Sequence, residues 1–209
     1  MTAVGLGLGR RALGQVHDNL VFGRRVRVLS EALAAQLPRG ARVLDVGAGS
    51  GDMAVAIMQL RPDVRIEGVD VLVRPGTAIP VVQYDGRHIP HADGAFDAAL
   101  LIDVLHHTDD PIAVLGEVAR VARAVVVKDH YRNGPAAQMR LRFMDWVGNA
   151  PHGVRLPYNY LSRAQWTEGF RKLDLQVTAI DEALALYPAP VSWLFGKGLH
   201  FVAKLQRAA

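Results

Sequence analysis

The segment from Val43 to Asp52 constrains the fold more than any other part of the chain. An apolar run leads into glycines at positions 47, 49 and 51, and apolar residues at helical spacing follow from Asp52. Glycines let a backbone approach a ligand closely, and the first turn of a helix offers unpaired N–H groups to an anion. We therefore predict a buried strand, a ligand-binding loop and an amphipathic helix in succession.

Short apolar runs alternate with helical patterns through the first two thirds of the chain. We expect strands at Arg42–Val46, Arg65–Asp70, Val81–Tyr84, Asp97–Ile102 and Ala124–Lys128, and helices at Arg24–Leu37, Asp52–Leu60 and Pro111–Val121. Strands and helices in this order predict a parallel sheet covered on both faces. The expected fold class is therefore α/β, with a doubly wound, mostly parallel sheet.

The last third of the chain has a different pattern. A helix is expected at Gly134–Trp146, a loop at Gly148–Leu161, and a second helix from an N-cap at Ser162 to about Arg171. Two strand-like runs, Leu173–Ile180 and Leu199–Leu205, then form a hairpin-like pair joined through Tyr187–Pro190 and Ser192–Gly198. We predict seven strands, the last antiparallel, in a single domain over 1–209. Residues 1–38 would form an N-terminal helical cap and 134–161 a lid or acceptor insertion.

Composition excludes several classes of protein. The chain has no cysteine, which removes disulfides, thiolate metal sites and cysteine nucleophiles. Basic residues exceed acidic ones by 24 to 20, and the densest group interleaves with apolar residues as an ordinary helix face does, so we expect no nucleic-acid partner. That group is Arg10, Arg11, Arg24, Arg25 and Arg27. No apolar run has the ~18 residues of a membrane span. The N-terminus reverses the order of a secretory signal, so we expect a cytoplasmic protein.

The glycine spacing separates two kinds of nucleotide site. The dinucleotide fingerprint is G-x-G-x-x-G, whereas this loop reads G-x-G-x-G. Asp45, two residues before the first glycine, would repel a pyrophosphate but suits a ligand that carries an ammonium and a sulfonium. The segment resembles motif I of the class I S-adenosylmethionine (SAM)-dependent methyltransferases. The similarity continues in order from about Arg24 to Leu205. Over this range the chain resembles the small single-domain methyltransferases that are grouped with the quinone-biosynthesis enzymes.

This resemblance implies SAM as the cofactor and assigns residues to it. The methionine part would pack on Gly47, Gly49 and Gly51, with its ammonium near Asp45. Asp70 and Val71 would meet the ribose, Asp85 and Gly86 the adenine, and Asp103 would lie at the fourth strand's end. Two of these acids have a plainer alternative, since Asp70 fits a solvated strand end and Asp85-Gly86 a common turn. Between the second and third strands, Arg74-Pro75-Gly76 prevents a long helix, so Leu72 and Val73 are candidate adenine contacts on a loop.

Polar residues after the fourth and fifth strands are candidates for acid–base work. Asp103 and His107 follow the fourth strand, and Asp129 and His130 end the fifth. An aspartate beside a histidine can hold an imidazole ready to accept a proton near neutral pH. Plain packing or capping roles are equally compatible with these residues. We expect no metal, because adjacent histidines on extended chain point to opposite faces and no third ligand is evident.

The aromatic loop that follows is a candidate acceptor wall. Trp146, His152, Tyr158 and Tyr160 would contact the acceptor, although a loop packed on the sheet edge fits each of them too. The predicted activity is methyl transfer from SAM to a small-molecule acceptor at oxygen, nitrogen or carbon. The alternatives are a SAM-binding partner or sensor without catalysis and, less favoured by the glycine spacing, a nicotinamide-dependent oxidoreductase.

Overall fold

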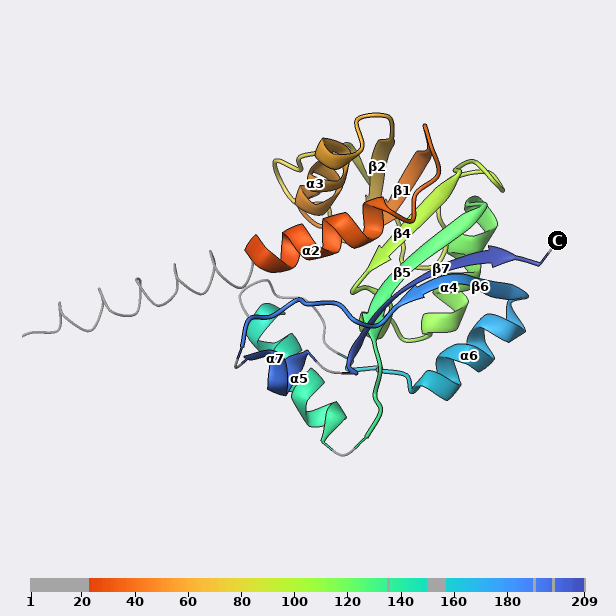
Figure 1. Ribbon diagram of the computed structural model, residues 1–209. Coiled ribbons are helices and arrows are strands. Elements are labelled where there is room, and N and C mark those ends of the chain that lie inside the picture. Colours follow the sequence, from red (N-terminus) through yellow and green to blue (C-terminus); the bar gives the residue numbers. More distant parts are fainter. Residues whose placement is uncertain (1–22, 135, 150–156, 190, 197, 209) are drawn as a thin grey trace, which may run out of the picture.

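Seven strands form one twisted sheet in the order β3-β2-β1-β4-β5-β7-β6 (Figure 1). The computed structural model describes residues 23–134, 136–149, 157–189, 191–196 and 198–208, with the backbone alone for 145–149 and 194. The strands are β1 (Arg42–Val46), β2 (Arg65–Asp70), β3 (Val81–Gln83), β4 (Ala98–Ile102), β5 (Ala124–His130), β6 (Leu175–Asp181) and β7 (His200–Arg207). The first five are parallel, and β7 runs antiparallel to both β5 and β6. The predicted fold class and strand number are confirmed.

Helices cover both faces of the sheet (Figure 1). The described helices are α2 (Gly23–Ala34), α3 (Asp52–Leu60), α4 (Pro111–Val121), α5 (Ala137–Asn149), α6 (Arg163–Lys172) and α7 (Val191–Phe195), with a 3-10 helix, η2, at Leu105–His107. Successive side chains of a strand point to opposite faces, so each central strand serves two cores. In β5, for example, Val125 and Val127 pack with α4 and α6, whereas Val126 packs with α2 and α3.

Local signals account for several of the helix ends. The Asp110 carboxylate accepts hydrogen bonds from the backbone N–H groups of Ile112 and Ala113 and begins α4. Ser162 is the N-cap of α6, as the sequence predicts, and it forms a capping box with Gln165. Such caps satisfy N–H groups that have no partner within the helix. They therefore fix where each helix starts.

Several boundaries differ from the prediction. For example, α2 ends at Ala34 and not at Leu37, and β7 runs over His200–Arg207 and not Leu199–Leu205. Helix α5 begins at Ala137 and continues to Asn149, so the loop starts later than Gly148. Strand β6 starts at Leu175, because Asp174 has a φ of 55° and turns the chain after α6. Strand β5 extends to His130, and the segment before β7 contains α7. The predicted absence of a helix between β2 and β3 is confirmed.

Candidate cofactor and acceptor site

The glycine loop begins directly after β1, at the edge of the sheet where the parallel strands end. Gly47, Gly49 and Gly51 have φ values of 77°, 58° and 82°, in the left-handed region that favours glycine. A Cβ atom at Gly47 would lie 2.5 Å from the Val104 side chain, whereas one at Gly49 would have no atom within 4 Å. Gly47 is therefore required by packing within the protein, and Gly49 faces open space that a ligand can use.

Asp70, at the end of β2, is joined to this loop. Its two carboxylate oxygens accept hydrogen bonds from the backbone N–H groups of Gly49 and Leu72, at 2.8 and 2.9 Å. A carboxylate has about four lone-pair sites, so two further donors, such as ribose hydroxyls, can be accommodated. Asp70 thus connects the glycine loop to the residues that follow β2.

Asp45 lies beneath the loop and is 3% exposed. Burial, and to a lesser extent the nearby charge of Asp70, raises the pKa of Asp45 to about 7. A buried carboxylate in this state gains from a neighbouring cation, which restores the charged form. The position therefore suits a ligand with a positive charge and opposes one with a pyrophosphate.

An apolar surface follows Asp70. Val71, Leu72 and Val73 are 54%, 60% and 37% exposed, which is unusual for three consecutive large apolar residues. Gly86 lies beside Val71, since a Cβ there would be 3.2 Å from the valine side chain. The open glycine loop, the Asp70 carboxylate and this apolar surface fit the methionine, ribose and adenine parts of SAM.

Asp85 is engaged in its own turn. Its Oδ1 atom accepts hydrogen bonds from the backbone N–H groups of Arg87 and His88, both at 2.7 Å. These hydrogen bonds, above all that from His88, lower the pKa of Asp85. The turn alternative for this residue therefore has direct support, and its contact with adenine stays a prediction.

A buried charge network lies at the ends of β4 and β5. The Asp103 carboxylate forms ion pairs with Lys128, which is fully buried, and with Arg25 from α2. Burial alone would raise the pKa of Asp103, but the two cations hold it well below its ordinary value. The backbone of Asp103 has a φ of 57°, a conformation with a cost that its surroundings must offset. Asp103 is thus held rigidly beside the glycine loop.

A second pair lies next to this network. The His106 Nδ1 atom is 2.7 Å from the Asp129 Oδ1 atom, and both side chains are 1% exposed. Burial alone would raise the pKa of Asp129, but the His106 ring overrides this effect and the pKa is lowered. The same carboxylate oxygen accepts the backbone N–H of His130 at 2.8 Å. Asp129 therefore orients both histidines.

His130 and His200 extend this group into β7. The His130 Nδ1 atom is 3.3 Å from Asp129 and 3.6 Å from Asp103. Burial, with the charge of Lys128, lowers the pKa of His130 to about 4 and also lowers that of His200. A pKa near 4 makes His130 a weak base at neutral pH.

Of the two described aromatic residues of the predicted acceptor wall, Tyr160 lies over these histidines and Tyr158 lies next to Tyr160. The Tyr160 ring stacks on His106, with centroids 5.1 Å apart, and its hydroxyl donates to the Leu141 carbonyl at 3.1 Å. The Tyr158 ring is covered by the Arg142 guanidinium at 4.7 Å. The Trp146 side chain and the whole of His152 lie outside the described residues. Residues 1–22 of the predicted cap also lie outside them.

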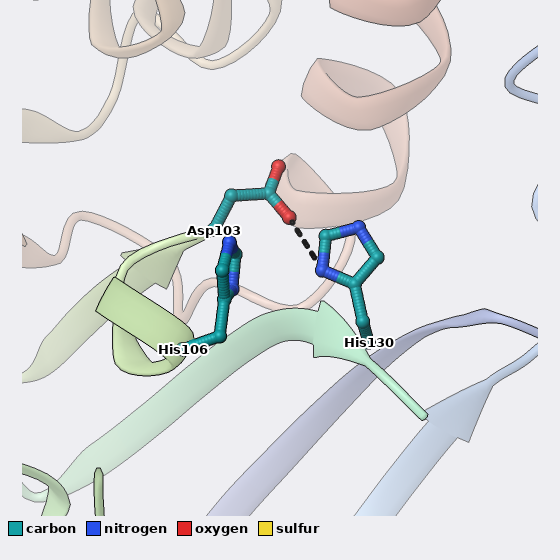
Figure 2. A group of neighbouring side chains, drawn as sticks. All are labelled: Asp103, His106 and His130. Atoms are coloured by element: carbon teal, nitrogen blue, oxygen red, sulfur yellow. Dashed lines mark ion pairs between the residues drawn. The ribbon is translucent and has the colours of Figure 1, made fainter. Parts of the chain in front are cut away.

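The structure corrects the reasoning about the histidine pair. His106 and His107 lie on η2 and not on extended chain, and their ring centroids are 4.2 Å apart. The fold also supplies a third group, because Asp103, His106 and His130 have potential ligand atoms within 4.8 Å of one another (Figure 2). However, Asp103 already pairs with Lys128 and Arg25. A divalent ion at this triad would have to overcome the repulsion of both cations.

Sequence reasoning missed four members of this region. His106 was not among the candidate bases, whereas the adjacent His107 was, yet it is His106 that contacts Asp129. The sequence predicts only that Arg25 lies on a helix face, Lys128 at a strand end and His200 in a strand of the hairpin pair. Lys128 did leave a signal, since it follows four apolar residues in a strand that is buried throughout. A lysine is almost never fully buried unless it is paired. No comparable local signal distinguishes Arg25 from its neighbouring arginines.

Sheet order, glycine loop and strand-end acids together define a Rossmann-like methyltransferase architecture. A family model described as a methyltransferase domain matches residues 20–180. The chain therefore belongs to the family of SAM-dependent methyltransferases, as the resemblance implied.

The chain matches its curated relatives over only part of their length. An O-methyltransferase of Aspergillus nomiae is 34% identical over 48% of this chain and 49% of its own. A demethylmenaquinone methyltransferase of Roseiflexus castenholzii is 32% identical over 61% of this chain and 57% of its own. The chain thus matches about half the length of these relatives.

Solved structures share the fold at low identity. A Burkholderia thailandensis 1,6-didemethyltoxoflavin N1-methyltransferase, crystallised with 1,6-didemethyltoxoflavin and S-adenosylhomocysteine, has a TM-score of 0.63 and 18% identity over 100% of this chain and 92% of its own. A putative methyltransferase from Haloferax volcanii, in complex with its Trm112 activator, has a TM-score of 0.65 and 17% identity over 94% and 93%. These likenesses support the seven-stranded Rossmann-like fold.

Proposed function

We propose that this protein methylates a hydroxyl group of a small-molecule acceptor, using SAM. The observation that carries the choice of oxygen is the buried His106–Asp129 pair, with its 2.7 Å contact. A hydroxyl holds its proton at neutral pH and needs a base, whereas a neutral amine does not. Bound SAM supplies a methyl group on a positively charged sulfur.

His106 is the proposed base. Its Nδ1 atom is bound to Asp129, so Nε2 is the ring atom that accepts the hydroxyl proton as the bond from carbon to sulfur breaks and that from carbon to oxygen forms. Asp129 stabilises the protonated ring and holds its orientation. Holding the acceptor in line with the methyl group contributes most of the acceleration, since well-oriented reactants gain ~7–11 kcal/mol.

The other candidate residues take positioning roles in this proposal. Asp103 lies between the glycine loop and the histidines and orients the acceptor side of the cofactor. His107 adjoins His106, and His130 packs edge-on against the His106 ring at 4.9 Å. Tyr158 and Tyr160, with Trp146 and His152, would form the acceptor wall within the 134–161 insertion. Asp45, Asp70, Val71 and Asp85, with the glycines Gly47, Gly49, Gly51 and Gly86, hold SAM. We place this activity in the cytoplasm and in one domain over 1–209.

A tritiated-methyl assay over a panel of acceptors with phenol, alcohol, amine or activated-carbon groups tests the proposal. We expect label on a hydroxyl, and a loss of about 10²–10⁴ in kcat for His106→Gln with SAM affinity unchanged. Asp129→Asn should shift the pH–rate profile. The matched control is His88→Gln, an exposed histidine on the β3–β4 loop. Label on amines or carbon alone, or full activity in His106→Gln, would refute the assignment to oxygen.

The alternative is a SAM-binding partner or sensor without catalysis. It is favoured by the depth of the acid–base group, since His106 and Asp129 are each 1% exposed. It predicts calorimetric binding of SAM with no labelled product from any acceptor class. A nicotinamide cofactor is tested in the same calorimeter, where NADH should give no heat at concentrations that saturate SAM binding.

A further inference from the structure

Helix α5 presents an apolar surface outward. Ala137 and Leu141 face the interior and are each 1% exposed, whereas Met139 and Phe143 are 68% and 55% exposed. Met139 and Phe143 are four residues apart and therefore lie on one side of the helix. An ordinary surface helix has polar residues on that side. The outward face of α5 thus carries two large apolar side chains where polar side chains are expected.

Helix α7 enlarges this apolar area. It lies beside α5 (Figure 1), and the ring of Phe195 is 6.1 Å from that of Phe143. Trp193 on α7 is 71% exposed. Trp193 and Met139 are the two most exposed large apolar residues of the described chain. We call the residues Met139, Phe143 and Trp193, with Arg140 and Arg142, the α5–α7 face.

Arginines lie beside this apolar area on the α5 side. Arg140 and Arg142 flank Met139 and Phe143 along α5, whose only acidic residue is Asp145. A hollow of about 750 Å³ at the start of α5 is lined by Arg132, Arg142 and Met139, with Gly134, Ala136, Ala137 and Gln138. Arg132 contacts the Gln165 amide oxygen and Arg142 covers Tyr158, and neither has an ion pair with a described residue. Positive charge is therefore available beside exposed apolar side chains.

We propose that the α5–α7 face docks on an anionic phospholipid membrane. Tryptophan, phenylalanine and methionine insert into the headgroup boundary, while arginines bind phosphate and anionic headgroups. The hollow between Arg132 and Arg142 fits a lipid phosphate with its chains directed along Met139. Among the described residues no helix has the length and apolar character to cross a bilayer.

Membrane docking would also explain why the α5–α7 face is apolar. Tyr160 on the inner side of α5 stacks on His106, so the membrane-facing helix is one layer away from the proposed acceptor site. An acceptor dissolved in the bilayer would thus enter the protein near α5, the helix that contacts the membrane. The docking itself does not depend on which atom is methylated.

Vesicle co-sedimentation of the full chain tests the proposal. We expect partition onto phosphatidylcholine vesicles containing 30% phosphatidylglycerol, and at least tenfold less onto phosphatidylcholine alone. Met139→Glu with Trp193→Ala should reduce partition at least tenfold, and Arg142→Glu about fivefold or more, from the ~1 kcal/mol per basic residue near an anionic surface. The matched control is Leu60→Glu, an exposed apolar residue at the end of α3 that is 49% exposed.

Other occupants of the face give different results. Equal partition onto both vesicle types, or none, would overturn the proposal. So would a concentration-dependent dimer in ultracentrifugation that the Met139→Glu and Trp193→Ala changes abolish, because a second copy would then cover the face. Inorganic phosphate at millimolar concentration should not displace the protein from vesicles, and displacement would indicate a site for free phosphate. SAM calorimetry on the same variants should be unchanged, so this test is separate from that of the methyl transfer.

Discussion

The two halves of the site at the sheet edge are built in different ways. The proposed cofactor half, at β1 to β3, consists of a glycine loop, a strand-end carboxylate and exposed apolar side chains. The proposed acceptor half, at β4, β5 and β7, consists of buried ionisable groups that pair with one another. Asp70 is hydrogen-bonded to backbone N–H groups near the loop, whereas Asp103 is bound to side chains 25 and 78 residues away in sequence. We therefore expect substitutions in the first half to affect mainly ligand affinity, and substitutions in the second half to affect mainly the stability of the fold.

Removing the central charge of the acceptor half should have the largest effect. Asp103→Asn leaves Lys128 buried without its main ionic partner, so we expect a loss of about 3–5 kcal/mol in unfolding free energy. Urea denaturation measures this loss. Lys128→Met in the same chain should recover much of it, because the unpaired charge is then removed. A loss below about 1 kcal/mol would show that solvent reaches Lys128.

Two glycines of one loop should respond differently. Gly47→Ala places a methyl group against Val104, so we expect a loss of about 2–3 kcal/mol in unfolding free energy, from overpacking and the left-handed backbone together. Gly49→Ala meets no neighbour, so only the backbone cost of about 1–2 kcal/mol applies. Its SAM affinity should nevertheless fall at least tenfold. Equal stability losses, with SAM affinity retained in Gly49→Ala, would contradict the assignment of Gly49 to the ligand.

Asp70 tests the cofactor half without the strain of a backbone change. Asp70→Ala should weaken SAM binding about 10–100-fold, since each hydrogen bond to a charged group contributes ~1.5–3 kcal/mol. Unfolding free energy should fall by less, because Asp70 lies at a strand end. Calorimetry and thermal denaturation of the same sample measure the two effects. A melting temperature that falls in step with affinity would make Asp70 a structural residue.

The smallest expected effect is a pH dependence from Asp45. Because SAM brings a cation toward a carboxyl whose pKa is about 7, its affinity should rise severalfold between pH 6 and 8. The folded-state pKa is raised, so unfolding free energy falls as pH rises from about 4 through 7. Asp45→Asn should remove both slopes. Calorimetry across this range, with Ser30→Ala as a buried control on α2, distinguishes this effect from a general pH response.

The positions of the strands and the glycine loop could be predicted from short stretches of sequence. The residues from Val43 to Asp52 carry both the strand-to-helix turn and its ligand loop, because a glycine spacing acts on the backbone next to it. Asp70 could be selected as a candidate because it lies at the end of an apolar run. The boundary errors at α5 and β6 arose where a turn is decided by one residue, such as Asp174 with its positive φ.

The acceptor half was predicted less completely for a physical reason. His106 and His107 are adjacent in sequence, and only the turn of η2 decides that His106 meets Asp129. Arg25, Lys128 and His200 come from three separate elements, and no local pattern ranks Arg25 above its neighbours.

Sequence alone thus determined the strands and the glycine loop, because period and spacing act over a few residues, and the family resemblance that this loop carries indicated SAM. Only the tertiary structure decided which charged groups pair at the ends of β4 and β5, and that α5 turns apolar side chains outward. Such pairings depend on the distance between elements, and a charge leaves water only when packing brings a partner to it.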